Sequence, residues 1–286
     1  MKFKNIVKVV ALICLVLIMH GCCSNKLASI QTTLEKKGAL KFKVSAIVEL
    51  GKLMGDRKGF TDAALEKPLR LSIEYLFADD SMTQQNTAQT FLSAAQNRPE
   101  LFKQVSNDIF LKLQPPGMAL DRFALERLAK AFKAVNDKEP FRYFAEITEK
   151  LYDINALYNY SVFMNYGETR DVFEFFVTGI KRLFKRKKRD EIWTKTLDNL
   201  ITGLGKHGVK VQDNQENSRT AHKVLCAIFY MHGVELSRKQ SSVSNFKEAL
   251  GRVLGDRNMS DAAFNEAMDA TSFEVVSPIT EDGKEW

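Results

Sequence analysis

The sequence predicts an all-α protein of about ten to twelve helices, arranged as a compact multi-helical bundle or as an irregular stack of helical hairpins. Three observations lead to this fold class. Apolar residues recur every three or four positions over most of the chain, which is the period of a helix face. The chain has 20 Phe and only 6 Pro, so a dense apolar core is interrupted at few points. No alternation of polar and apolar residues between hairpin turns predicts a pair of strands.

Residues 1–21 predict an export signal. Three lysines, Lys2, Lys4 and Lys8, precede an uninterrupted apolar run of eleven residues over 9–19. A basic region followed by a short apolar region is typical of a secretory signal peptide. A spanning helix needs roughly 20 apolar residues, so the alternative of an uncleaved anchor helix requires flanking residues such as Lys8 to lengthen the span.

The end of this segment, Met19-His20-Gly21-Cys22, resembles the lipobox of bacterial lipoprotein precursors. The resemblance covers the export signal alone. It implies that Cys22 becomes the first residue after cleavage, carries acyl chains such as palmitate and anchors the chain at a membrane. Cys23 follows, rather than the Asp of inner-membrane lipoproteins, so the resemblance implies a cell-envelope protein with the outer membrane preferred over the inner. A secreted or signal-anchored protein is the alternative.

The remaining chain is large enough for one helical domain or two small ones. Removal of residues 1–21 lowers the formal net charge from +7 to +4, because three basic residues and no acidic ones are removed. The clearest internal break is Pro115-Pro116-Gly117. It predicts helical subdomains over 22–114 and 117–273, or one continuous domain, followed by a flexible tail over 274–286.

The first predicted helices follow Cys22 with almost no polar tether. One is expected over 26–34 and a second over 42–54. Gly55 ends the second, because glycine takes a left-handed cap without a Cβ clash. Thr61 has a side chain suited to cap the next helix, which continues to about residue 77.

Two further starts precede the break at Pro115. Ser81 and Gln84 have capping-box spacing and predict a helix to about residue 95. Pro99 is expected in the first turn of the following helix, where its missing N–H costs nothing.

The C-terminal part is expected to begin with an amphipathic helix over 121–135. Pro140 then starts a helix that the apolar spacing extends through Tyr158. Residues 169–204 carry two apolar stripes on opposite faces, which predicts a turn near Arg189 with Asp190 capping a new helix.

The last third of the chain contains the longest predicted loop. It is expected to span Gly203, Gly205, Gly208 and the polar run 212–218. Three helices are predicted after it, over 219–232, from a Ser244 cap to Leu254, and over 260–270.

The chain contains an internal echo. Residues 50–57 (LGKLMGDR) and 250–257 (LGRVLGDR) are identical at five of eight positions and conservative at the other three. The match resumes, after a one-residue deletion, at Asp62–Ala64 and Asp261–Ala263. The echo predicts a helix, a glycine stop and a capped restart at both places, either by duplication of one helix–turn–helix unit or as two independent solutions. Two copies are too few to predict a stacked array.

A basic cluster places seven positive charges within nine residues. It follows the apolar stretch 173–180, so the segment 173–189 is a candidate for contact with anionic lipid head groups or an acidic protein. A solvated helix end that complements the helix dipole is the alternative interpretation. Export makes nucleic acid an unexpected partner. The cluster consists of Lys181, Arg182, Lys185, Arg186, Lys187, Lys188 and Arg189.

His222 and Cys226 are four residues apart and would share a helix face, with His232 further along the chain. Zinc accepts this mix of ligands. The same helix is apolar enough to belong to the core, and nothing fixes a third ligand, so we expect no metal and no cofactor. A disulfide between Cys23 and Cys226 is an alternative in an oxidising compartment.

No nucleophile elbow, zinc-protease motif, phosphate loop or dinucleotide-binding glycine pattern occurs in the sequence. The sequence therefore predicts a membrane-anchored envelope lipoprotein that acts as a non-catalytic binding or scaffold module. The alternatives are a membrane-acting helical protein that uses 173–189, and an enzyme of unrecognised type.

Overall fold

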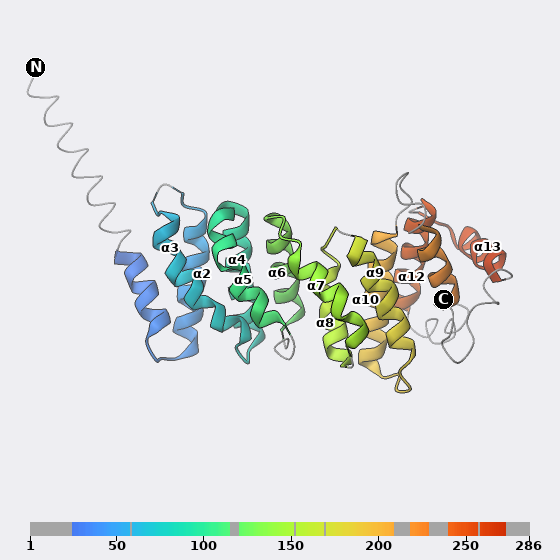
Figure 1. Cartoon of the computed structure of the whole chain (residues 1–286), viewed down its shortest axis with the longest axis horizontal. Coiled ribbons are helices and arrows are strands. Elements are labelled where there is room, and N and C mark those ends of the chain that lie inside the picture. Colours follow the sequence, from blue (N-terminus) through green and yellow to red (C-terminus); the bar gives the residue numbers. More distant parts are fainter. Residues whose placement is uncertain are drawn as a thin grey trace, which may run out of the picture. The chain divides into compact units, whose positions relative to one another are not determined.

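The computed structural model describes residues 25–272, with gaps at 58, 115–119, 152, 169, 209–217, 229–239 and 257 (Figure 1). The described residues form thirteen α-helices, two 3₁₀ helices and no β-strand. The all-α prediction is confirmed, with slightly more helices than expected. None of these described helices combines the length and the apolar character needed to cross a bilayer. The predicted signal peptide and tail lie outside the described residues.

The chain divides into two compact units, residues 1–137 and 138–286. The boundary expected at Pro115–Gly117 therefore falls inside unit 1. The reason is that α6 (Arg122–Ala134), which follows this break, packs extensively on α4 (Ser81–Asn97), which precedes it.

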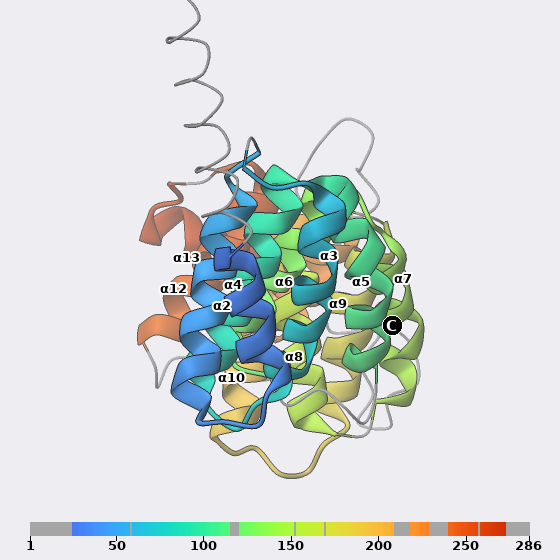
Figure 2. The ribbon, with the colours of Figure 1, turned by 90° about the vertical axis from the view of Figure 1, so that its left-hand side faces the viewer.

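Unit 1 is a two-layered stack of helical hairpins. Within it, α2 packs on α4 and α4 on α6, whereas α3 packs on α5. Figure 2 shows α2 and α4 on one side of the unit and α3 and α5 on the other. Besides α4 and α6, the unit contains a helix over residues 25–35, α2 (Leu40–Met54), α3 (Asp62–Ser72), η1 (Ile73–Phe77) and α5 (Pro99–Leu113).

Unit 2 repeats this pattern of second-neighbour packing. There, α8 packs on α10 and α10 on α12, whereas α7 packs on α9. The described elements of the unit are α7 (Glu139–Ile147), η2 (Thr148–Lys150), α8 (Ile154–Met164), α9 (Arg170–Phe184), α10 (Glu191–His207), a helix over residues 218–228, α12 (Gln240–Leu254) and α13 (Asp261–Ser272).

Each unit has a core rich in buried aromatic rings. In unit 1, Phe102 packs edge-on against Phe91 and Phe132, with ring centroids 6.5 and 5.5 Å apart. In unit 2, Phe144 stacks on Tyr160 at 4.4 Å. Such ring pairs add about 1 kcal/mol each beyond the burial of their apolar area, which explains how a chain rich in phenylalanine forms two dense cores.

Two predicted helix N-caps are confirmed, namely Thr61 before α3 and Asp190 before α10, and the capped restart that the echo predicts after Gly255 is made by Ser260 before α13. Their side-chain oxygens accept hydrogen bonds from first-turn N–H groups at 3.1 to 3.3 Å. The turn predicted near Arg189 is also confirmed, because α9 ends at Phe184 and α10 begins at Glu191.

Other predicted helix ends need correction. The cap of α4 is Asp80, whose Oδ1 accepts from the backbone N–H of Thr83 at 2.8 Å, rather than Ser81. Helix α12 begins at Gln240, before the predicted Ser244 cap. Gly55 ends α2, but its φ of −77° is right-handed and not the expected left-handed cap.

The single helix predicted from Pro140 through Tyr158 is broken in two. Helix α7 ends at Ile147 and α8 begins at Ile154, after an Asp153 cap that accepts from a backbone N–H at 3.0 Å. The apolar spacing crosses this break without interruption, which concealed it in the sequence. The Asp153 side chain accepts a hydrogen bond from the first turn of α8, and this local interaction favours a new helix start over a continuous helix.

Gly203 and Gly205 lie inside α10 and not in the predicted loop. A Cβ atom on Gly203 would lie 2.1 Å from the Phe176 ring, and one on Gly205 would lie 2.5 Å from Ala249. These glycines therefore permit close helix packing. Residues 209–217 of the predicted loop lie outside the described part of the chain.

Candidate functional site

The proposed lipidation site, Cys22, lies outside the described residues, as does Cys23. The described helical body begins at residue 25, three positions later. A lipid on Cys22 would hold the first helix directly at the membrane surface, so the surface formed by that helix and α2 is the first candidate for function.

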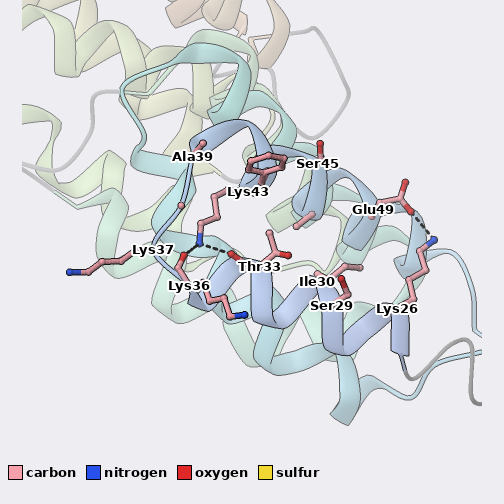
Figure 3. Close-up of a pocket in the computed structure, with 13 residues that line it drawn as sticks. Lys26, Ser29, Ile30, Thr33, Lys36, Lys37, Ala39, Lys43, Ser45 and Glu49 are labelled. Carbon is pink, nitrogen blue, oxygen red and sulfur yellow. Dashed lines mark hydrogen bonds and ion pairs between the residues drawn. The ribbon is translucent and has the colours of Figure 1, made fainter.

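A groove with a volume of about 560 Å³ runs between helix 25–35 and α2 (Figure 3). Apolar side chains line part of it, and several lysines surround it. The lining includes Ile30, Ala39, Phe42 and Ala46 together with Lys26, Lys36, Lys37 and Lys43.

Lys43 joins the two helices of this groove. Its ammonium group is buried and donates to the carbonyl oxygens of Thr33 at 2.5 Å, Leu34 at 2.9 Å and Lys36. These carbonyls end helix 25–35, where no intrahelical donor reaches them and where the helix dipole favours a cation. Lys43 is therefore structural, and Figure 3 shows it pointing toward these carbonyls.

The carboxylates beside the groove are already paired with lysines. Hydrogen bonds from Lys26 and then Lys52 lower the pKa of Glu49 to about 2. A hydrogen bond from Lys67, at 2.8 Å, likewise holds the pKa of Glu35 below its usual value. These carboxylates therefore remain ionised at neutral pH and are occupied by partners outside the loop that connects the two helices.

The segment 36–42, made of the connecting residues 36–39 and the first three residues of α2, is exposed at every position and is called the α2 entry loop below. Leu40 and Phe42 are 41% and 59% exposed. Lys36, Lys37 and Lys41 make no ion pair with a carboxylate of the described residues. Figure 3 shows Lys37 extending away from the helix pair. The loop therefore presents apolar and positive side chains together. The sequence does not reveal this surface, because its character depends on which side chains the fold leaves exposed.

The basic cluster divides between the end of α9 and the turn after it. The turn, residues 185–189, is exposed except for the half-buried Arg186. Lys188 pairs with Asp190 at 2.9 Å, which raises the pKa of the lysine and lowers that of the carboxyl group. Arg189 lies over the ring of Trp193, 5.5 Å from its centroid. Part of this charge is thus used to stabilise the start of α10.

The apolar face that precedes the basic turn belongs to the core of unit 2. On α9, Phe173, Phe176 and Ile180 are at most 5% exposed. Lys181 and Arg182 are half-buried near the end of the same helix. The segment 173–189 therefore presents a basic turn to solvent without the apolar face that an interfacial helix requires.

The two metal candidates within the described residues, His222 and Cys226, belong to no metal-binding cluster there. No group of three potential metal-ligating side chains comes together among the described residues. Cys226 is buried at 3% exposure, and His222 is half-buried one turn before it. His232 lies outside the described residues, as does Cys23, so the alternative disulfide stays a prediction.

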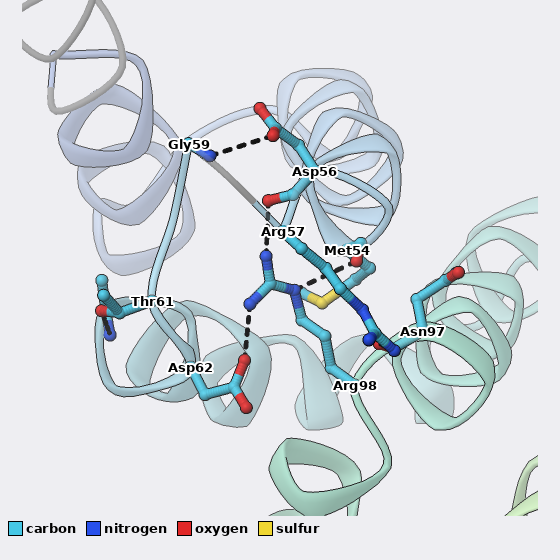
Figure 4. Close-up of polar contacts among 9 residues, drawn as sticks. Met54, Asp56, Arg57, Gly59, Thr61, Asp62, Asn97 and Arg98 are labelled. Carbon is cyan, nitrogen blue, oxygen red and sulfur yellow. Dashed lines mark hydrogen bonds and ion pairs between the residues drawn. The ribbon is translucent and has the colours of Figure 1, made fainter.

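A second cavity, of about 420 Å³, lies beside Arg98 at the junction of α4 and α5. Figure 4 shows the Arg98 guanidinium directed at the turn between α2 and α3. It donates from Nε to Met54 O at 3.0 Å, from Nη2 to Asp56 O at 2.5 Å and from Nη1 to Asp62 Oδ1 at 2.5 Å. These bonds occupy the guanidinium on three sides, so we assign Arg98 a structural role.

No family model matches the sequence, and no curated protein matches it. Two solved structures of engineered proteins from the Northeast Structural Genomics Consortium are similar to 80% of this chain. Their sequence identities are 16% and 13%, their TM-scores 0.46 and 0.45, and 98% and 97% of their own lengths are covered. A designed armadillo repeat protein is similar over 79% of this chain and 99% of its own, at 10% identity and a TM-score of 0.41. At these values the likeness says nothing about activity.

Proposed function

We propose that the chain is a bacterial envelope lipoprotein, anchored through acyl chains on Cys22, whose helical body is a non-catalytic binding or scaffold module. The observation that carries this proposal is the lipobox-like Met19–Cys22, which ends three residues before the helical body begins. The first described helix begins at residue 25, so a lipid on Cys22 would hold a folded helical body close to the membrane.

The use of buried polar groups supports a binding role over a catalytic one. Arg98 and Lys43 donate to carbonyls at helix ends, and the indole N–H of Trp193 donates to Leu183 O at 3.1 Å. Each of these buried groups has a structural task. Helical stacks of this kind present extended surfaces to partners.

The alternative of a membrane-acting helix over 173–189 has less support. Its apolar face is buried in unit 2, so membrane insertion would require α9 to leave the core. The outer membrane remains our preferred location, on the resemblance at residues 19–23 alone.

The anchoring proposal is tested by replacing Cys22 with Ser in cells grown with labelled palmitate. We expect the wild-type chain to carry label and to sediment with membranes, and the Cys22→Ser chain to lose both properties. The matched control is Cys23→Ser, the same chemical change one residue later, which should keep both. A Cys22→Ser chain that is still labelled and processed would contradict lipidation at this residue.

The binding role is tested in the same cells by crosslinking the anchored wild-type chain and identifying its neighbours. We expect a defined protein partner that is recovered in constant ratio to the chain and is lost with Cys22→Ser. Recovery of lipid alone would argue against a scaffold role while leaving the anchor intact.

A further inference from the structure

The α2 entry loop carries the sequence Lys36-Lys37-Gly38-Ala39-Leu40-Lys41-Phe42 between helix 25–35 and α2. Leu40 and Phe42 occupy the first turn of α2 and are two positions apart. Three other large apolar side chains of unit 1, Met82, Leu111 and Phe123, are also exposed, but each of them lies on a different helix. Two exposed apolar residues in one turn, next to three lysines, differ from the isolated exposed residues that any protein surface shows.

The charge around these residues is positive. The nearest carboxylates are held elsewhere, Glu35 by Lys67 and Glu49 by Lys26 and Lys52. Lys41 lies 5.1 Å from the centroid of the adjacent Phe42 ring. An aromatic ring accompanied by lysines is typical of protein segments at the membrane–water interface, where the ring enters the head-group region and the lysine reaches the phosphates.

The start of α2 adds to this positive potential. Its N-cap residue, Ala39, has no side chain to cap the first turn, and the first turn contains no acidic residue. The N–H groups of that turn and the positive end of the helix dipole therefore face the same side as the lysines. The exposed end of α2 thus complements an anionic surface by side-chain charge and by backbone dipole.

We propose that the α2 entry loop is a second membrane-contact site, which inserts Leu40 and Phe42 into an anionic phospholipid surface while Lys36, Lys37 and Lys41 bind its phosphates. The inference rests on the proposed anchor at Cys22. A helix of eleven residues is about 16 Å long, so helix 25–35 lying along the surface brings its anchored start and the loop at its end to one membrane plane. A bilayer explains the apolar pair, the lysines and the nearby anchor together.

The consequence is a fixed orientation for the first helix pair. A lipid anchor alone allows the body to rotate about one point. A second contact at the far end of helix 25–35 would hold that helix parallel to the surface.

The test uses the full lipid-anchored chain, reconstituted into vesicles of phosphatidylglycerol and phosphatidylcholine whose acyl chains carry bromine. In the Phe42→Trp variant, we expect the new tryptophan to be quenched by the brominated chains and to emit at shorter wavelength. The wild-type signal, from Trp193 and Trp286, is subtracted. The matched control is Phe123→Trp, because Phe123 in the first turn of α6 is 55% exposed and also follows a basic residue. Equal quenching at both positions, or none at residue 42, would overturn the proposal.

A charge variant tests the head-group contact. In the Phe42→Trp background, we replace Lys36, Lys37 and Lys41 with Gln. In anionic vesicles, each replacement should lower the equilibrium constant for insertion of the loop about fivefold. In pure phosphatidylcholine the same replacement should have little effect. Equal quenching with and without the lysines in anionic vesicles would contradict the proposed phosphate contact.

Failure of the loop proposal can be distinguished from failure of the proposed lipid anchor. If the wild-type chain carries no palmitate label, or if the Cys22→Ser chain is still labelled and processed, the proposed lipidation fails, yet quenching of Trp introduced at residue 42 still scores loop insertion. If the anchor is confirmed and residue 42 is not quenched, the loop proposal alone fails.

Discussion

The two copies of the sequence echo build the same unit but end their first helix differently. Helices α2 and α12 are both 15 residues long, and each is followed by Gly-Asp and a capped helix. In both turns the Asp side chain accepts a backbone N–H, from Gly59 to Asp56 at 3.0 Å and from Asn258 to Asp256 at 3.2 Å. The shared residues therefore determine the helix, the turn and the restart.

The second turn, after α12, is capped by its own backbone. Gly255 has a φ of +82°, in the left-handed region that favours glycine. The N–H of Gly255 donates to Arg252 O at 3.2 Å, and that of Asp256 donates to Gly251 O at 2.8 Å. This is a Schellman motif, which satisfies the last carbonyls of α12 with donors from the next residues of the chain.

The first turn, after α2, is capped by a residue that is distant in the sequence. Gly55 stays right-handed, and Arg98, which is 5% exposed, donates to Met54 O and Asp56 O. Met54 and Asp56 are 44 and 42 residues away from Arg98 in the sequence. A guanidinium at the α4–α5 junction thus caps Met54 O and Asp56 O in the first turn, whereas the backbone N–H groups of the second turn cap Gly251 O and Arg252 O. The comparison shows that one local sequence supports two caps, and that tertiary contacts choose between them.

The largest test of this difference is removal of the arginine. Arg98→Ala leaves two carbonyls of the first turn without their donor and Asp62 without its partner. We expect a loss of about 1.5–3 kcal/mol in the free energy of unfolding, as for losing hydrogen bonds to a charged donor, because the Asp62 left behind is 44% exposed. Urea denaturation of the full chain measures the loss, and hydrogen exchange of α2 and α3 locates it.

The matched control is Arg57→Ala. The Arg57 guanidinium also donates to a backbone carbonyl, that of Asn97, but it is exposed. We expect a loss of less than about 1 kcal/mol. Equal losses from both arginines would mean that burial of Arg98 does not matter, and the proposed difference between the two turns would be wrong.

A smaller effect is expected from the glycine pair. Gly255→Ala forces a Cβ atom into left-handed backbone, at a cost of about 1–2 kcal/mol. Gly55→Ala meets only Lys52 O at 3.6 Å in right-handed backbone, so it should be neutral or stabilising by about 0.4–1 kcal/mol. Hydrogen exchange of α12 and α2 reports each change separately. Destabilisation of the same size at both positions would show that the two caps are equivalent.

These cases show which features the sequence could predict. The all-α class and the caps Thr61 and Asp190 depend on neighbouring residues, and they were predicted correctly. The left-handed conformation predicted for Gly55 was wrong. The residue that caps this turn, Arg98, comes from another helix pair. No local pattern marks Arg98 as buried.

In the candidate sites, too, residue content could be predicted from the sequence, but burial could not. The seven basic residues of the basic cluster are visible in the sequence, but burial of the α9 apolar face is a property of the packing. In the α2 entry loop, lysines and apolar residues are interspersed, as they are in many amphipathic segments. The structure separates Lys43, which is buried against carbonyls, from Lys41 and Phe42, which are exposed. Spacing alone could not make that distinction.

The smallest expected difference between the two turns is their response to acid. Asp261, in the first turn of α13, pairs with Lys247 at 2.5 Å while its side chain is 93% exposed. The hydrogen bond from Lys247 holds the pKa of Asp261 below its usual value. The unfolded chain therefore binds the proton first, and the pair stabilises the fold above about pH 4 and stops doing so as the pH falls through the folded pKa. In the first turn, two of the three acceptors of Arg98 are backbone carbonyls, which do not titrate.

We therefore expect acid to loosen the second turn before the first. A carboxyl titration followed by NMR should place the midpoint of Asp261 below that of an exposed Asp. In the Lys247→Gln variant the midpoint should rise to the usual value, because glutamine supplies no charge. Added salt should shift the wild-type midpoint in the same direction, since the pair is exposed to screening. If the Asp261 midpoint is the same with and without Lys247, the pair contributes nothing to the second turn, and that turn rests on the Gly255 cap and the Ser260 cap alone.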